Sequence, residues 1–213
     1  MQAAWGDRRL AGELRRHRAA VTVGGLGAVL GLCVGAATGA GGWPVYLVVL
    51  LLGAAAVTAV DLRVGLSRLT VWGLVVFALG HVAGGMVGVG DGVLYEQWLV
   101  GRVVRYDNLQ HAWGFGFAGR AVWESLRPQL ARPSSAAAAL VLIVLGGCGL
   151  GALNEVIEYA LTKLLPETNV GGYENTARDL VANLTGTTLM AGAVLRGRGS
   201  GDPRRWRGRR RGA

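Results

Sequence analysis

The chain has few charged residues and few cysteines, and both shortages narrow the class of protein. Charged side chains make up 16% of its 213 residues, whereas soluble domains average about 25%. The two cysteines, Cys33 and Cys148, form no Cys-x-x-Cys pair and have no histidine at zinc-ligand spacing, which supports neither a disulfide framework nor a zinc finger. Gly88 and Gly90 lack the lysine of a nucleotide loop, and no recognisable nucleic-acid module is present.

Apolar residues, in contrast, make up 52% of the chain and form long runs, such as residues 19–42, 43–60 and 136–154. About 20 mostly apolar residues form a helix that crosses the hydrocarbon core of a membrane. The 36 glycines are interleaved with Val, Leu and Ala, which favours close helix packing over a disordered linker. We therefore predict an all-α, polytopic bundle of transmembrane helices, whose Gly-rich faces would also allow a homo-oligomer.

Six membrane spans are predicted. They cover about residues 19–38, 43–60, 69–89, 107–126, 136–161 and 176–195, with a stretch at the membrane surface over 91–106. The domains are then a basic cytoplasmic segment (1–18), the six-span domain (19–195) and a basic, disordered cytoplasmic tail (196–213). The first apolar stretch exceeds the roughly 7–15 residues of a signal-peptide core, which favours a retained anchor over a cleaved signal.

The distribution of basic residues predicts the orientation of the spans. Thirteen of the 22 lie in two terminal segments, residues 8–18 and 196–211. Cytoplasmic loops carry an excess of Lys and Arg, close to anionic lipid. We therefore expect both termini in the cytoplasm, with membrane lipid and no nucleic acid as the partner.

Three pairs of polar residues interrupt the apolar segments. They are Asp107 and His111, Glu155 and Glu158, and Asp179 and Asn183. A spacing of three or four residues places both members of a pair on one helix face. An ionised side chain at the bilayer centre costs about 2.5–3.5 kcal/mol, so such residues face a partner, a cavity or a ligand. In the predicted topology all three pairs, together with His81, lie toward the extracytoplasmic side.

This combination of residues is compatible with a metal site, and Asp107 with His111 is equally compatible with an acid–base pair in which Asp107 orients the imidazole. Imidazole and carboxylate groups four residues apart can share one ion, and two carboxylates on one face repel unless a cation, a proton or an arginine lies between them. Four residues are assigned as catalytic and as ligands of a divalent metal ion: His111, Glu155, Glu158 and Asp179. Arg178, Asn183 and Asp107 are assigned to substrate binding, Arg178 because a guanidinium binds phosphate or carboxylate.

Structural roles are the alternatives to these assignments. Asp107 could cap its helix. Asp179 and Asn183 could cap the last helix and pack against its neighbours. One of the two glutamates could be neutral while the other pairs with Arg178 or Arg120. Arg120 and Glu124 are predicted to form an internal ion pair nearer the cytoplasm, and His81 a hydrogen bond between helices.

Three sequence blocks carry a resemblance to a known family. They are RYDNLQH from Arg105, EVIEY from Glu155 and GYENTARDLVANLTG from Gly172. In this order they resemble the YjdF-like family of bacterial inner-membrane proteins, with a looser similarity to VanZ-like proteins. The family often has an Asp near the position of Asn175 and an aromatic residue where Ala112 stands. The resemblance implies a multi-pass protein of the bacterial cytoplasmic membrane and defines no activity.

The function predicted from the sequence is therefore a site near the extracytoplasmic leaflet that acts on, or binds, a lipid or lipid-linked headgroup with the help of a metal. A small proton-coupled transporter and a membrane scaffold without catalysis are the alternatives, so whether the protein is an enzyme stays open. The position of the polar pairs near one face favours the first function, because carriers usually bind their cargo near the midplane and often contain inverted repeats.

Overall fold

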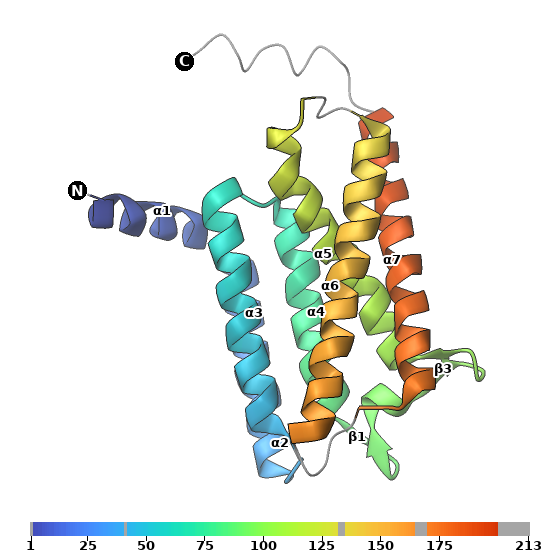
Figure 1. Ribbon diagram of the computed structural model, residues 1–213. Coiled ribbons are helices and arrows are strands. Elements are labelled where there is room, and N and C mark those ends of the chain that lie inside the picture. Colours follow the sequence, from blue (N-terminus) through green and yellow to red (C-terminus); the bar gives the residue numbers. More distant parts are fainter. Residues whose placement is uncertain (1, 41, 132–134, 165–169, 200–213) are drawn as a thin grey trace.

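The computed structural model describes residues 2–40, 42–131, 135–164 and 170–199 (Figure 1). Within these ranges seven α-helices contain most of the residues. Their bounds are α1 Gln2–Arg16, α2 Arg18–Ala37, α3 Trp43–Val64, α4 Arg68–Met86, α5 Tyr106–Leu126, α6 Ala136–Leu164 and α7 Tyr173–Gly199. The tail that was predicted to be disordered lies, from residue 200 onward, outside the described residues.

Each of the six segments predicted to span the membrane contains a long helix, α2 to α7 in order. Four of them, α2, α3, α4 and α6, are both long and apolar enough to cross a membrane. The helices α5 and α7 are also long, with 21 and 27 residues, but they carry more polar side chains. The described part of the chain is thus mostly helical, and composition supports four of the six predicted spans.

The helices α5, α6 and α7 form a closely packed group, and α4 joins this group to α2 (Figure 1). Because α6 runs opposite to α5 and α7, it ends where they begin. The helix α3 lies at the edge of the bundle, and Asp61 is its buried residue. Its apolar side chains, including Leu47, Leu51 and Leu52, are exposed, as expected for a helix that faces lipid.

Glycines let the backbone of α5 approach its two neighbours closely. A Cβ atom on Gly116 of α5 would lie 3.0 Å from the carbonyl oxygen of Gly186 on α7. A Cβ on Gly186 would overlap the carbonyl group of Ala112, and one on Gly119 would overlap that of Ile143 on α6. Small residues at such contacts are typical of membrane helices. Close packing through glycine, predicted from composition, is confirmed at these positions.

Residues 88–105 form two short antiparallel hairpins, which include the end of the predicted third span (69–89) and most of the stretch predicted to lie at the membrane surface (91–106). The strand β1 (Gly88–Val89) pairs with β2 (Gly92–Val93), and β3 (Trp98–Val100) pairs with β4 (Val104–Arg105). Gly90 and Gly101 have φ angles of 60° and 52° at the hairpin turns, a left-handed conformation that glycine adopts without steric cost. The short 3-10 turn η1 (Leu94–Glu96) connects the hairpins and contacts α4 and α5.

The basic segment at the N-terminus forms the helix α1, which was not predicted. The chain bends at His17, so that α1 points sideways away from the bundle instead of continuing along α2 (Figure 1). Its Leu10 and Leu14 are exposed, as are Arg9 and Arg15. Basic, amphipathic helices of this kind lie in the plane of the membrane interface.

We expect Gly186→Ala to lower the melting temperature of the detergent-solubilised protein, because the new methyl group would push α5 and α7 apart. Overpacking costs about 1–3 kcal/mol, and each kcal/mol lowers Tm by about 2–4 °C in a chain of this size. Gly192→Ala on the same helix is the control, since no atom of another helix lies within 4 Å of the added Cβ. Equal melting temperatures for the two variants would contradict the proposed contact.

Candidate functional site

The predicted His/Glu/Asp cluster is present at the end of the bundle where α5 and α7 begin and α6 ends. We call it the outer cluster, after the orientation predicted from the sequence, and define it by Asp107, His111, Glu155, Glu158 and Asp179. Asp107 is the second residue of α5, and Asp179 lies in the second turn of α7. The antiparallel arrangement of the three helices brings these residues together, although they come from distant parts of the sequence.

The imidazole of His111 lies at the centre of the outer cluster and is buried. Its Nε2 atom is 3.7 Å from Asp107 Oδ1 on the same helix. Its Nδ1 atom is 3.6 Å from Glu155 Oε1 on α6 and 3.2 Å from Asn183 Oδ1 on α7. Each ring nitrogen therefore faces a carboxylate at a distance longer than an ordinary hydrogen bond.

Two glutamates of α6 form one side of the cluster. Glu155 is buried, and neither of its carboxylate oxygens has a hydrogen-bond partner among the described residues. Thr176 and Asn154 lie close to this carboxylate, but without hydrogen-bond geometry. Glu158 accepts a hydrogen bond of 2.7 Å from Asn154 Nδ2. One donor atom each from His111, Glu155 and Glu158 lies within 4.8 Å of the others, which makes these residues one possible ligand group.

Asp179 forms the other side of the cluster and is fully buried. Its Oδ1 accepts a hydrogen bond of 2.8 Å from Asn108, and its Oδ2 accepts one of 2.6 Å from Asn175. Asn175 also donates to Asp107 Oδ2, at 3.1 Å. A second possible ligand group consists of Asp107, His111 and Asp179, because one donor atom from each also lies within 4.8 Å of the others. The four predicted metal ligands are thus divided between two groups that share His111.

Three asparagines of the site were missed as functional residues by the sequence analysis, namely Asn108, Asn154 and Asn175. Their amide groups donate to the cluster's carboxylates. The signal was present in the spacing, since Asn154 and Asn175 stand four residues before the carboxylates that they contact on the same helix face. An uncharged amide in an apolar segment attracts less attention than a carboxylate, although it needs a hydrogen-bond partner as well.

The two arginines considered as partners of the glutamates lie elsewhere. Arg178 Nη2 is 2.7 Å from Glu174 Oε1 on the exposed side of α7, and its guanidinium lies 5.3 Å from the centre of the Trp98 ring. Arg120 pairs with Glu124 at 3.0 Å, toward the other end of α5. That second ion pair was predicted and is confirmed. The carboxylate of Glu124 also accepts hydrogen bonds from the hydroxyl groups of Ser67 and Thr70 at the start of α4.

A third arginine, Arg105, borders the outer cluster; in the sequence it begins the RYDNLQH block but was assigned no role in the site. Arg105 lines a cavity of about 160 Å³ together with Asp107 and Asn175. Its guanidinium lies 4.6 Å from the centre of the Trp98 ring, on which Arg178 also packs. The Nε atom of Arg105 is buried and has no hydrogen-bond partner among the described residues. A positively charged group with an unused donor therefore lies beside the carboxylates.

His81 was predicted to bond to another helix, and it bonds instead to the turn η1. Its Nδ1 atom lies 2.5 Å from the hydroxyl of Tyr95. Burial raises the pKa of Tyr95 well above its usual value, so the phenol stays protonated and can donate this hydrogen bond. The contact holds the turn η1 against α4. His81 belongs to neither of the two possible ligand groups.

The comparisons with known proteins agree with the architecture. Residues 19–198 match the family described as "Predicted membrane protein (DUF2238)". The chain belongs to this family, because the match covers most of its length. No curated protein and no solved structure matches the chain.

We expect Glu158→Gln to raise the melting temperature in EDTA at pH 8.5, because it removes one of several negative charges held close together. The glutamine retains an oxygen that can accept from Asn154. A gain of about 1 kcal/mol corresponds to roughly 2–4 °C. Glu174→Gln is the control, since that carboxylate is exposed and paired with Arg178, and should leave Tm nearly unchanged. A lower Tm for Glu158→Gln would show that the carboxylates do not repel.

Proposed function

We propose that the outer cluster binds a divalent cation and, through this cation and Arg105, the anionic headgroup of a lipid or lipid-linked molecule. In this proposal α5 and α7 also cross the membrane. The chain then has six spans, both termini lie in the cytoplasm, and the cluster faces the extracytoplasmic side of the bacterial cytoplasmic membrane, as the resemblance to YjdF-like proteins implies. The observation that carries the proposal is the buried carboxylate of Glu155, which faces His111 without a hydrogen-bond partner among the described residues.

Charge balance supports a cation. Four carboxyl groups share the outer cluster with one imidazole. Among the described residues, no arginine or lysine forms an ion pair with them. Carboxylates at such separations repel one another unless they are protonated or bridged by a cation. A divalent ion would balance two of these charges at once.

The separation of His111 and Glu155 is close to that of two ligands of one metal ion. Ligands about 2.0–2.1 Å from a tetrahedral ion lie roughly 3.3 Å from one another, and His111 Nδ1 is 3.6 Å from Glu155 Oε1. We assign His111, Glu155 and Glu158 as the ligands. The other nitrogen of His111 then faces Asp107, an arrangement in which a carboxylate orients a metal-bound imidazole. One imidazole with several carboxylates suits Mn²⁺, Fe²⁺ or Zn²⁺.

Two arginines support an anionic ligand beside the ion. Arg105 lines the cavity next to Asp107, and Arg178 lies on the same Trp98 ring. A guanidinium binds the oxygens of phosphate through paired hydrogen bonds. A bound divalent ion supplies a Lewis acid that attracts phosphate oxygens. Together these groups would hold a phosphate-containing headgroup at the membrane surface.

A proton-coupled carrier is the second candidate, because His111 lies between Asp107 and Glu155 and could pass a proton from one to the other. The depth of the cluster favours binding at the surface. Glu158 lies six residues before the end of α6, which is about 9 Å along the helix. Carriers usually place the cargo near the bilayer midplane.

We expect the purified, EDTA-treated protein to bind one Mn²⁺ in the outer cluster, measured by calorimetry and by metal analysis. Glu155→Gln and His111→Ala should each abolish this binding, because each removes a ligand. Glu174→Gln should bind Mn²⁺ like the wild type. Protein that folds normally and binds no Mn²⁺ would rule out the metal site and favour the proton carrier.

The headgroup is tested in nanodiscs that contain phosphatidylglycerol or a polyprenyl phosphate, with phosphatidylcholine as the neutral background. Arg105→Gln should retain Mn²⁺ and lose Mn²⁺-dependent lipid binding in native mass spectrometry, whereas Glu155→Gln should lose both. The two lipids distinguish a phospholipid from a lipid-linked phosphate. Lipid binding that is equal with and without Mn²⁺ would contradict the proposed role of the cation.

Single cysteines test the proposed topology in a background without Cys33 and Cys148. We expect an impermeant maleimide to label cysteines at Asp91 and Gly172 on intact cells, because both positions are exposed at the end of the outer cluster. Cysteines at Gln129 and Arg196 should react only after the cells are opened. Labelling of Gln129 on intact cells would show that α5 does not cross as proposed, and labelling of Arg196 would show the same for α7.

A further inference from the structure

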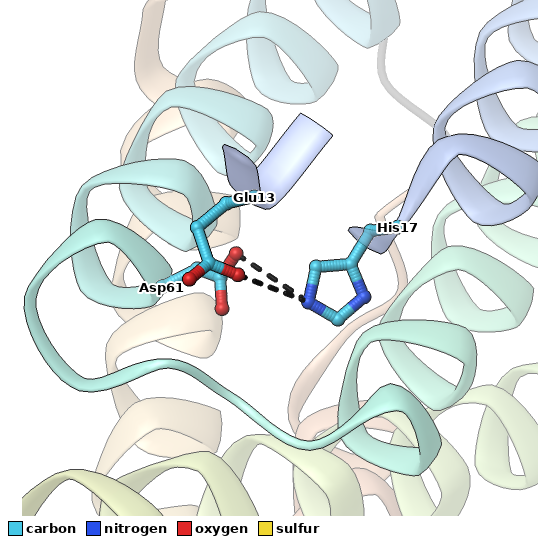
Figure 2. Close-up of side chains that lie close together, drawn as sticks. All are labelled: Glu13, His17 and Asp61. Carbon is cyan, nitrogen blue, oxygen red and sulfur yellow. Dashed lines mark ion pairs between the residues drawn. The ribbon is translucent and has the colours of Figure 1, made fainter. Parts of the chain in front are cut away.

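A second group of metal-ligating side chains lies at the opposite end of the bundle, outside the site already described. Figure 2 shows its three members, Glu13, His17 and Asp61. Glu13 comes from α1, His17 stands at the bend between α1 and α2, and Asp61 lies near the end of α3. One donor atom from each lies within 4.8 Å of the others. We call these three residues the inner cluster.

The imidazole of His17 is aimed into the inner cluster without a hydrogen bond. Its Nε2 atom is 3.6 Å from Asp61 Oδ2 and 3.8 Å from Glu13 Oε2 (Figure 2). His17 is only 5% exposed, and this nitrogen has no hydrogen-bond partner among the described residues. A buried polar atom is nearly always hydrogen-bonded. An unpartnered imidazole nitrogen between two carboxylates therefore indicates a site that can bind a further group.

The carboxylate of Asp61 is fixed in the orientation that a ligand needs. Its Oδ1 accepts a hydrogen bond of 2.7 Å from the backbone N–H of Leu66, in the turn that joins α3 to α4. Gly65 allows this turn with a φ of 67°. The other oxygen, Oδ2, is left to face His17. The fold thus orients one ligand before any ion binds, which is the role of the outer contacts in metal sites.

We propose that Glu13, His17 and Asp61 bind a divalent transition-metal ion, for which Zn²⁺ is the probe. The separations of 3.6 and 3.8 Å are slightly longer than the roughly 3.3 Å between neighbouring ligands of a tetrahedral zinc ion. Neither Glu13 nor Asp61 lines the cavity of about 250 Å³ that borders His17, so only the three side chains are assigned as ligands. Bound there, the ion would connect α1 to the end of α3.

Positive charge near the inner cluster opposes the binding of a cation and predicts how one variant changes the affinity for Zn²⁺. Arg15, Arg16, Arg18 and Arg68 line the same cavity. Arg16 Nη1 lies 3.2 Å from Glu13 Oε2, the oxygen that also faces His17, and therefore competes with an ion for this ligand. Removing its charge by Arg16→Gln should strengthen the binding of Zn²⁺.

The test is a Zn²⁺ titration of the full chain after EDTA treatment, in a Glu155→Gln background that disables the outer cluster. We expect one Zn²⁺ per chain. His17→Ala and Asp61→Asn should each weaken binding at least about tenfold, and Arg16→Gln should tighten it. Asp61→Asn keeps the oxygen that accepts from Leu66, so that a loss of affinity does not depend on a disrupted turn.

A second measurement follows α1 directly. Zn²⁺ should slow hydrogen exchange of the α1 amides in the wild type and leave it unchanged in His17→Ala. Zn²⁺ binding that is the same with and without His17 would overturn the proposal, as would its absence from protein that folds normally. The contacts of His17 with the two carboxylates would then only hold α1 against α3. Mn²⁺ binding that depends on Glu155 is a separate result, so the two proposed sites can fail independently.

Discussion

The close backbone contact of α5 with α6 and α7 determines where the polar side chains of the outer cluster lie. Gly116, Gly119 and Gly186 allow it, because a Cβ atom at each would press on or overlap the neighbouring backbone. At this separation, side chains of ordinary length from three helices reach one another. His111 can then contact residues of α6 and α7 as well as Asp107 on its own helix. A wider spacing would leave each polar pair alone in lipid, at a cost of several kcal/mol.

Both ends of the bundle hold a buried histidine close to carboxylates, in different electrostatic surroundings. In each, a buried histidine has carboxylate oxygens 3.6–3.8 Å from its ring nitrogens. The inner cluster lies among arginines, and Arg16 already contacts Glu13. The outer cluster contains four carboxyl groups, and Arg105 only borders it. The outer cluster is therefore the stronger candidate for a cation, and the inner cluster depends more on the fixed geometry of its ligands.

The sequence predicted the helices more completely than their contacts. Four helices follow from apolar runs alone, because a bilayer demands a minimum length of apolar helix; α5 and α7 were also predicted, although they are more polar. The helix α1 has no such run, since arginines interrupt its leucines, and it was missed. The outer cluster followed from spacing and topology. The contact of His17 with Asp61 did not, because it depends on the bend between α1 and α2 and on the turn after α3. Neither feature has a signature in hydropathy.

The length of α6 relates the outer cluster to the thickness of the membrane. Glu155 stands 19 residues after Ala136, the first residue of the helix, which is about 28 Å along its axis. The same number of residues separates Leu126 from Asp107 on α5. In the proposed topology, a hydrocarbon core of about 30 Å would therefore end close to these carboxylates. In a thinner bilayer they would stand among the headgroups, and in a thicker one they would sink into hydrocarbon, so lipid chain length would change their hydration.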